Sequence, residues 1–285
     1  MNQMYRILSL FFLFFACSKS DSQTEPTPAG FAKKPEIISL KEGMINETSG
    51  IADSKLNTGY LWVQQDSGNP PLIYLLKHDG TITDSILIES ATNRDWEDIV
   101  LSGDQLFIGD IGDNNTIYPD YVFYRFNEPS LGTERVSSPD KIEFKYPDGS
   151  HDAEAFLVDP NTKDIYIITK SDTKSKVYKL AYPQNTSSMN EAVFVADLGF
   201  NGAVSAAISP DGKEIIVKTY LSLYYYTKNA TDDISVALAK APTTLDYQVE
   251  AQGEAISFGL DNKGFYTLSE KALNVTPSLN YYKRN

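Results

Sequence analysis

The sequence predicts an all-β fold, a five-bladed β-propeller, and three observations support the prediction. A short polar residue, a second short residue and an apolar strand recur five times, at steps of 48, 57, 51 and 49 residues. Turn signals divide each step into short apolar segments. The chain has 18 Tyr and 14 Phe, which favour strands over helices. A period near fifty residues is typical of a repeated four-stranded blade.

The repeat begins at an equivalent point in each unit. The five segments are Ser49-Gly50-Ile51, Glu97-Asp98-Ile99, Glu154-Ala155-Phe156, Ser205-Ala206-Ala207-Ile208 and Glu254-Ala255-Ile256. Equivalent positions of the blades surround one axis in a propeller. We therefore expect five residues that are far apart in sequence to meet in one small ring.

The N-terminus carries the pattern of an export signal. Residues 1–16 combine one early positive charge with a nine-residue apolar run, too short to span a bilayer as a mature helix. The run ends at Ala16-Cys17, which resembles a bacterial lipobox with Cys17 as the lipid-carrying residue. The alternative is an ordinary signal peptide with a chance cysteine. Residues 17–34 are rich in Ser, Thr, Pro and charge, and we expect a flexible tether there. The predicted location is therefore the bacterial cell envelope, with the membrane contacted through the lipid alone.

Composition excludes some classes of function. Acidic residues outnumber basic ones by 38 to 25, which argues against nucleic acid as a partner because phosphate backbones select clustered Lys and Arg. Cys17 is the only cysteine, so no disulfide supports the fold. The remaining length of about 250 residues is enough to bury a core without one.

The strands of the blades are predicted in order from the apolar segments between turn signals. The first unit is expected to contain Ile51–Asp53, Tyr60–Gln65, Leu72–Lys77 and Asp84–Ile88. The second is expected to contain Asp98–Leu101, Gln105–Ile108, Tyr121–Phe126 and Lys141–Tyr146. The third is expected to contain Ala155–Val158, Asp164–Thr169, Lys176–Leu180 and Ala192–Leu198. The fourth is expected to contain Ala206–Ser209, Glu214–Thr219, Leu223–Thr227 and Ile234–Ala239. Turn sequences such as Pro210-Asp211-Gly212 separate them.

The last unit offers only three strands before the chain ends. A spare apolar segment, Glu36–Leu40, precedes the first repeat. We expect it to supply the fourth strand of the last blade, which closes the ring and removes exposed sheet edges. Five blades then use every strand once, so the propeller domain is predicted to span residues 35–285.

Three of the five converging residues are glutamates, and this indicates a cation site. The predicted metal ligands are Ser49, Glu97, Glu154, Ser205 and Glu254. Ca²⁺ fits best, because it accepts six to eight oxygen ligands in loose geometry. The alternative is a set of solvated acids at strand starts. At Ser205 the larger apolar residue Ile208 follows three positions later rather than two, which indicates a bulge or a backbone carbonyl facing the axis.

Further polar residues end the second strands and should surround the same mouth. Asp66, Asp110 and Glu270 are candidates to take a proton from water, and Arg94, Lys170 and Lys218 are candidates to bind an anionic substrate. Turn and surface roles compete with each of these, because propeller loops need Asp, Asn and Gly. His151 lies near the ring in sequence, but a surface role is the more economical interpretation.

The order Ser, Glu, Glu, Ser, Glu at blade-length spacing resembles the soluble calcium-activated nucleotidases (apyrases). Trp96-Glu97 followed by Leu106–Gly112 looks like the second blade of that family, and Gly253–Ile256 looks like its closing segment. The resemblance implies a five-bladed propeller with an axial Ca²⁺ held by that series of residues. The third blade departs from the family, because Thr169-Lys170-Ser171-Asp172 stands where the family has consecutive arginines. More loosely, the chain resembles phytase-like and lactonase-like propellers.

Three classes of function remain open from the sequence. The first is Ca²⁺-dependent hydrolysis of a small anionic substrate of the phosphate type. The second is a non-catalytic propeller that binds a glycan, a peptide or a partner at the cell envelope. The third is glycan cleavage by paired carboxylates, for which Asp66, Asp110 and Glu270 are available.

Overall fold

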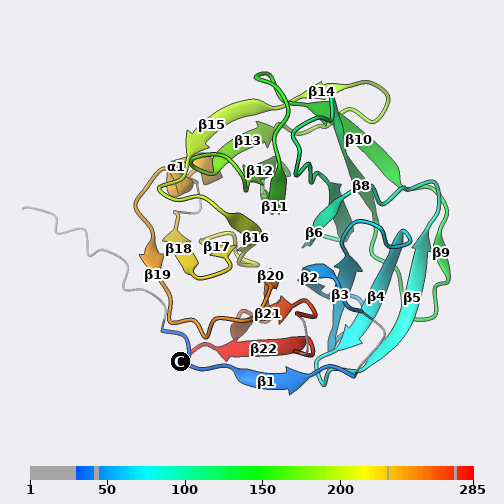
Figure 1. Ribbon diagram of the computed structural model, residues 1–285, viewed down its shortest axis with the longest axis vertical. Coiled ribbons are helices and arrows are strands. Elements are labelled where there is room, and N and C mark those ends of the chain that lie inside the picture. Colours follow the sequence, from blue (N-terminus) through cyan, green and yellow to red (C-terminus); the bar gives the residue numbers. More distant parts are fainter. Residues whose placement is uncertain (1–29, 42–44, 230, 273–274) are drawn as a thin grey trace, which may run out of the picture.

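Five small sheets surround a central axis in the computed structural model, and the chain passes through them in order (Figure 1). The structure describes residues 30–41, 45–229, 231–272 and 275–285. The fold is therefore a five-bladed β-propeller, as the fifty-residue repeat predicts. The predicted signal segment and Cys17 lie outside the described residues.

Each blade consists of antiparallel strands that follow one another in order from the axis to the rim. The first contains β2 (Thr48–Asp53), β3 (Tyr60–Gln65), β4 (Leu72–Lys77) and β5 (Ile82–Ile88). The second contains β6 (Trp96–Ser102), β7 (Gln105–Asp110), β8 (Tyr121–Asn127) and β10 (Asp140–Lys145). The third contains β11 (Ala153–Val158), β12 (Ile165–Thr169), β13 (Lys176–Leu180) and β15 (Val193–Asp197). The fourth contains β16 (Ala203–Ile208), β17 (Glu214–Thr219), β18 (Leu223–Thr227) and β19 (Thr243–Thr244).

The fifth blade closes the ring with a strand from the other end of the chain. Its strands are β20 (Gly253–Phe258), β21 (Gly264–Ser269), β22 (Ser278–Lys283) and β1 (Glu36–Ser39). Antiparallel pairing aligns Glu36 with Tyr281 and Ser39 with Ser278. The predicted closing role of Glu36–Leu40 is confirmed. Packing starts before residue 35, because Phe31 is buried and forms a bridge with Arg284.

Two short strands at the rim pair with the sheet of the preceding blade and so join neighbouring blades. β9 (Arg135–Val136) belongs to the second repeat but pairs in parallel with β5 of the first blade. β14 (Asn190–Glu191) belongs to the third repeat and pairs in parallel with β10 of the second. These two pairings cover outer edges that would otherwise expose unpaired backbone groups.

One predicted strand is wrong. Ile234–Ala239 was expected to be the outer strand of the fourth blade, but Ile234–Leu238 forms the short helix α1 and β19 takes the outer position. The Asp233 side chain caps the helix by accepting a hydrogen bond from the Ser235 N–H at 2.8 Å. Ile234, Ala237 and Leu238 are buried, a spacing that fits one face of a helix.

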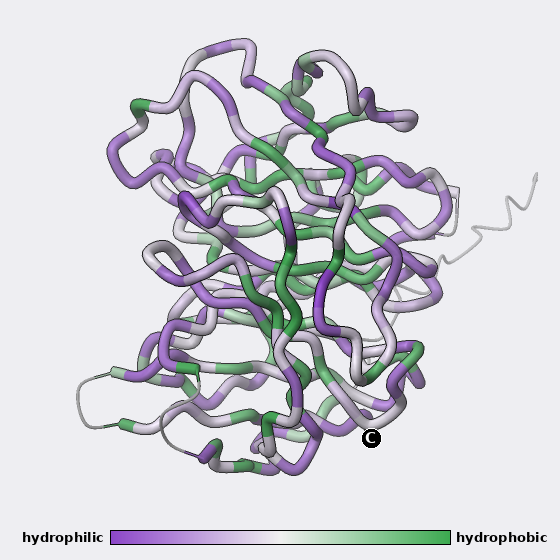
Figure 2. The backbone as a smooth tube through the Cα atoms, turned by 90° about the vertical axis from the view of Figure 1, so that its right-hand side faces the viewer, coloured by the Kyte–Doolittle hydropathy of each residue, from purple (hydrophilic) through white to green (hydrophobic). Residues whose placement is uncertain are grey.

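The hydrophobic core lies between the blades. Trp62 of the first blade and Trp96 of the second are fully buried in one cluster with Ile73 and Leu106. Figure 2 shows hydrophobic segments running through the interior and hydrophilic segments in the loops. No helix among the described residues is long and apolar enough to cross a membrane.

Asp233 should stabilise the fourth blade beyond its capping role, since its carboxylate also accepts hydrogen bonds from Tyr166 at 2.8 Å and Lys179 at 3.0 Å. We expect Asp233→Ala to lower the free energy of unfolding by about 1–3 kcal/mol, the sum of a lost cap and lost charged hydrogen bonds. Urea unfolding followed by circular dichroism measures this. The exposed Asp246 provides a matched control, and equal effects of the two substitutions would contradict the role.

Candidate functional site

Every innermost strand carries a β-bulge near its start, one residue pair further along in β6 than in the other four. The register shifts lie between Thr48 and Gly50, Glu97 and Ile99, Ala153 and Ala155, Ala203 and Ser205, and Gly253 and Ala255. A bulge bends the strand and changes the direction of a side chain locally. The repeated bulge therefore marks the point at which all five blades present residues to the axis.

The five innermost strands can be aligned with one another from their C-terminal ends, where each pairs with the beginning of the next strand of its blade. The aligned residues at that end are Asp53, Leu101, Val158, Ile208 and Phe258. Four positions before them lie Ser49, Glu97, Glu154, Val204 and Glu254, which we call the axial ring. Four of the five predicted ligands thus share one layer. In the fourth blade that position belongs to Val204, and Ser205 lies one residue further along.

The polar members of the axial ring are buried, and each has a partner. The Ser49 hydroxyl donates to the Glu97 carboxylate, and the Tyr220 hydroxyl donates to the Glu254 carboxylate. Burial raises the pKa of Glu97 well above its usual range, and the charge of Glu154 adds to the effect. Burial also raises the pKa of Glu254. The site therefore disfavours several bare negative charges and favours either protons or a cation.

Two further acids adjoin Glu97 and extend the cluster towards the first blade. Asp66 follows β3 and Asp95 precedes β6, and one ligand oxygen from each of Asp66, Asp95 and Glu97 lies within 4.8 Å of the others. We call these three residues the acidic trio. Burial, followed by the charge of Asp66, raises the pKa of Asp95 to about 6. Oxygen atoms at this separation can serve one hard cation.

Gln64, two residues before Asp66 in the chain, gives an independent sign of a missing polar partner. Its side chain is fully buried, and neither its Oε1 nor its Nε2 has a hydrogen-bond partner in the described part of the chain. It pairs with Gly50, which faces the second blade, so it leaves β3 on the same face as Asp66. A buried amide without partners is costly, and an ion or a water held by the trio would relieve that cost.

Lys170 places a positive charge in the axial ring. It follows β12, and its Nζ contacts the Glu154 carboxylate and lies 3.4 Å from the Tyr220 hydroxyl. The predicted anion-binding lysine thus lies at the site, paired with one of the predicted metal ligands.

Glu270 also lies at the mouth, close to Glu254. Burial raises the pKa of Glu270 to about 8, and the charge of Glu254 adds to the effect. The two carboxyl groups share a hydrogen bond. Asp66 and Glu270 are therefore the predicted acids that the fold brings to the ring.

The other three predicted residues have structural partners. Asp110 accepts a hydrogen bond from the Asp95 N–H at 2.8 Å and so holds the start of β6. The Arg94 guanidinium lies 4.0 Å from the centroid of the Tyr118 ring and donates to the Asp120 carbonyl at 3.0 Å. These contacts keep the Asp110 and Arg94 side chains away from the axial ring.

Lys218 is fully buried rather than exposed at the mouth. Its Nζ donates to the Gly253 carbonyl at 2.6 Å, to the Tyr247 hydroxyl at 2.8 Å and to its neighbour's carbonyl at 3.2 Å. Burial lowers its pKa to about 8. All three hydrogen atoms of the ammonium group have acceptors, so Lys218 joins the fourth and fifth blades instead of binding substrate.

Sequence reasoning missed Asp98, which fills the axis beneath the ring. Its carboxylate is fully buried and accepts hydrogen bonds from the Ser205 hydroxyl at 2.9 Å, the Ala206 N–H at 3.2 Å and the Ile99 N–H at 2.9 Å. It therefore ties the second blade to the fourth across the axis. The sequence does distinguish this position, because the second blade has a charged residue where the other four blades have the small residues Gly50, Ala155, Ser205 and Ala255.

The Asp98 layer separates the acidic mouth from a cavity of about 300 Å³ at the other end of the axis, where apolar residues are mixed with Asp53, Lys55 and several serines. The ends of all five innermost strands line this cavity, with Val100, Leu157, Ala207 and Ile256 among its residues. The two ends of the axis thus differ in chemistry, and the candidate site is the acidic one.

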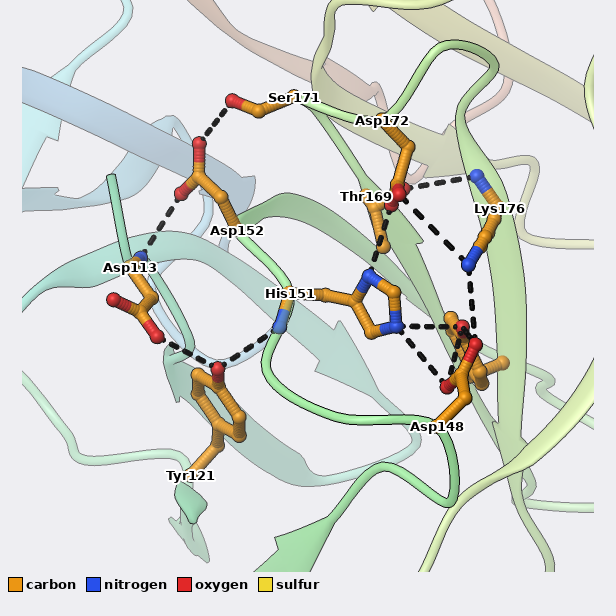
Figure 3. A network of polar contacts seen from close by, with 10 residues as sticks. Asp113, Tyr121, Asp148, His151, Asp152, Thr169, Ser171, Asp172 and Lys176 are labelled. Carbon is orange, nitrogen blue, oxygen red and sulfur yellow. Dashed lines mark hydrogen bonds and ion pairs between the residues drawn. The ribbon is translucent and has the colours of Figure 1, made fainter. Parts of the chain in front are cut away.

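A polar network supports the loops on the third-blade side of the mouth (Figure 3). His151, which was expected at the surface, is buried. Its Nδ1 lies 3.0 Å from Asp172, and its Nε2 lies 3.0 Å from Asp148 and 2.8 Å from the Tyr178 hydroxyl. Both ring nitrogens of His151 therefore have partners within this network, and we assign the residue a structural role.

Comparisons with known proteins identify no family. No protein-family model matches the chain, and no curated protein matches it. Among solved structures, a hydrazine synthase of Kuenenia stuttgartiensis aligns with a TM-score of 0.43 and 12% identity, over 80% of this chain and 57% of that one. A chain of a mitotic checkpoint complex aligns with a TM-score of 0.48 and 11% identity, over 97% of this chain and 99% of that one. The chain spans little more than half of the hydrazine synthase chain, and neither likeness bears on function.

Close packing at the axis predicts that Gly50 cannot gain a side chain. A Cβ atom there would lie 2.6 Å from the Asp98 Cα and 2.5 Å from the Ile99 nitrogen, both backbone atoms. We expect Gly50→Ala to lower the free energy of unfolding by about 1–3 kcal/mol, as for other overpacked cores. Gly199→Ala is the control, because nothing lies within 4 Å of its Cβ position. Chemical denaturation of both variants tests this, and a tolerated Gly50→Ala would contradict the described packing.

The network around His151 predicts a specific sensitivity to acid. Burial alone would raise the pKa of Asp148, but hydrogen bonds from Tyr178, His151 and Lys176 lower it to about 2. A carboxylate whose pKa is lowered in the folded state stabilises the protein above its unfolded pKa of 3.8. That stabilisation is lost as the pH falls towards 2. The melting temperature of Asp148→Asn should therefore lie below that of the unsubstituted protein at pH 6, and the gap should close by about pH 2. A gap independent of pH would contradict this role of Asp148.

Proposed function

We propose that this protein is a Ca²⁺-dependent hydrolase that acts on a small phosphate-type substrate at the acidic mouth of the propeller. The convergence of the acidic trio on the axial ring, in a buried space with unmet demand for positive charge, is the observation that carries the proposal. The resemblance of the ring to that of the calcium-activated nucleotidases supports it. The Val204 position departs from that pattern and leaves one ring ligand fewer.

The donor set fits Ca²⁺. Asp66, Asp95, Glu97 and the Ser49 hydroxyl offer oxygen ligands, and the amide oxygen of Gln64 lies on the same face of β3 as Asp66. No histidine or cysteine belongs to this cluster of described residues. Oxygen ligands of mixed type suit Ca²⁺, whereas zinc prefers nitrogen and sulfur.

The chain's own residues would divide the chemistry between them. When bound, the ion would polarise a phosphoryl oxygen of the substrate. Lys170 would neutralise the substrate's negative charge, and Glu270, which is not part of the Ca²⁺ donor set, would in its ionised form accept a proton from the attacking water. Arg94, Asp110 and Lys218 would act by holding the blades, since each makes structural contacts away from the axial ring.

Glycan cleavage is less well supported by the geometry. Inverting and retaining glycosidases keep their two carboxyl groups roughly 5–9.5 Å apart, to leave room for the sugar and a water. Of the three acids considered for this mechanism, Asp110 instead accepts a hydrogen bond from the Asp95 N–H and holds the start of β6. Only Asp66 and Glu270 then remain as a candidate pair at the ring.

A non-catalytic binding propeller is the second candidate, and one observation favours it. Lys218 is buried and Arg94 lies against Tyr118, so two of the three predicted anion-binding residues have other contacts. A mouth with many acids and a single lysine suits a cationic ligand or a Ca²⁺-bridged partner as well as a phosphate ester.

We further propose that the protein is anchored to the cell envelope by a lipid on Cys17. The described chain starts at the rim of the fifth blade, where the Asn285 N–H donates to the Gly30 carbonyl at 2.7 Å. A tether attached at the rim would leave both ends of the axis accessible.

Calcium binding and phosphate release test the proposed function together. We expect calorimetry to detect Ca²⁺ binding, and we expect phosphate release from a panel of nucleotides and phosphomonoesters that stops when a chelator is added. Because one carboxylate–dication contact is worth several kcal/mol even at an effective dielectric constant of 20, Glu97→Gln should weaken binding by at least about 100-fold.

Glu143→Gln is the matched control, since Glu143 is exposed on β10. Calcium binding without turnover on any phosphoester would favour the binding propeller instead. Unchanged calcium affinity in Glu97→Gln would contradict the proposed site.

A further inference from the structure

Lys170 provides an ammonium group within the ring of acids. Its Nζ contacts Glu154 and lies 5.4 Å from the centroid of the Tyr220 ring. The hydroxyl of that tyrosine donates to Glu254. The lysine and the tyrosine together thus connect two glutamates of the axial ring, one from the third blade and one from the fifth.

The ammonium group also lies in the field of the third glutamate. Burial lowers the pKa of Lys170, but the charges of Glu154, Glu254 and Glu97 outweigh this effect and raise the pKa overall. All three ring glutamates therefore act on one positive charge. Glu97 also belongs to the Ca²⁺ donor set, so an ion bound there would compete with that charge, because like charges at short range repel strongly in a buried site.

The side chain can leave this position without any change in its backbone. The Lys170 N–H donates to the Asp152 carbonyl at 2.8 Å, and its own carbonyl accepts from the Gly202 N–H at 3.0 Å. These bonds fix the backbone between the third and fourth blades. The side chain is 22% exposed and carries its charge on a flexible four-carbon stem. Rotation of that stem would move the ammonium group from Glu154 into the open mouth.

We propose that Lys170 is a tethered cation that occupies the axial ring and is displaced into the mouth when Ca²⁺ binds, where its ammonium group binds the anionic group of the substrate. This inference rests on the proposed function and adds an order of events to it. An empty site would hold its lysine among the glutamates. A site loaded with the ion would present the lysine to the substrate.

Charge balance supports the exchange. A dication offsets more of the negative charge of the axial ring and the acidic trio than a single ammonium group does. The displaced ammonium group then adds a positive charge at the mouth, where an anionic substrate must bind next to acidic residues. Ion binding and anion binding would therefore be positively coupled, and such coupling is reciprocal.

Calorimetry on three variants tests the competition. We expect Lys170→Met to tighten Ca²⁺ binding at least about fivefold, the lower end of typical coupling between sites. Lys170→Arg should weaken it, because a guanidinium group forms a firmer, two-pronged pair with a carboxylate. Lys174→Met is the matched control, since Lys174 is exposed in the same loop, and it should bind as the unsubstituted protein does.

Amine labelling tests the displacement itself, because removal of a nearby charge could tighten binding without any movement. Acylation by an N-hydroxysuccinimide ester, followed by peptide mass spectrometry, reports how accessible each lysine is. We expect labelling of Lys170 to rise several-fold in Ca²⁺ relative to chelator. Lys174 should label equally in both conditions, and the fully buried Lys218 should stay unlabelled in both.

The outcomes separate this inference from the proposed function. If Ca²⁺ binds but Lys170 labels equally with and without it, or if Lys170→Met binds no more tightly, the exchange is refuted and the proposed function stands. If only Lys170→Met binds Ca²⁺, the lysine is a permanent occupant of the ring, and both the exchange and the calcium dependence of the natural chain are refuted. If neither protein binds Ca²⁺, both proposals fail.

Discussion

The hydrogen-bonded carboxylate of Asp98 is the contact on which the geometry of the acidic mouth depends. Five innermost strands converge so closely that Gly50 has no room for a Cβ atom beside the backbone of residues 98 and 99. One side chain, from the second blade, fills the remaining space and is bound by donors from the second and fourth blades. The layer is thereby closed, and the axial ring above it is a blind-ended site. Solvent can reach its glutamates from one side only.

That closure explains the electrostatics of the ring. Carboxylates in a blind-ended site lose much of their hydration, which penalises the charged form. The chain offers several partial remedies, since Ser49, Tyr220 and Lys170 each provide a donor to one glutamate. Of these donors, only the uncharged Ser49 hydroxyl reaches the trio side, where Asp66 and Asp95 add further negative charge to Glu97. The demand for a cation is therefore greatest between the first and second blades.

Much of the fold was predictable because a propeller repeats its local signals. Turn sequences and alternating apolar residues gave the inner strands, and the spare segment before the first repeat indicated how the ring closes. Ile234–Ala239 was mispredicted because its apolar residues suit a strand and a helix equally well. The Asp233 cap and its contacts with Tyr166 and Lys179 favour the helix. Contacts of this kind join different blades and cannot be read from the spacing of residues along the chain.

The site residues divide in the same way. Glu97, Glu154 and Glu254 follow directly from the period, whereas Val204 is hidden by the polar Ser205 beside it, and only strand pairing resolves the two. Lys218 and Lys170 illustrate a second limit. Lys218 lies within β17 and Lys170 just after the equivalent strand β12 of the adjacent blade. The ammonium group of Lys218 is saturated by buried acceptors, whereas that of Lys170 lies at the ring. Sequence places a lysine at the end of a strand, but the packing of neighbouring blades decides whether its charge is buried or reaches the site.

The mouth is also asymmetric, and this bears on how it could work. Acids gather on the side of the first two blades, through Asp66, Asp95 and Glu97. The hydrogen-bond donors Lys170 and Tyr220 come from the third and fourth blades on the other side. A cation and an anion bound together would therefore occupy opposite sides of the axis, with the ring glutamates between them. Such an arrangement requires neither ligand to displace the other, and it makes the position of one lysine the link between them.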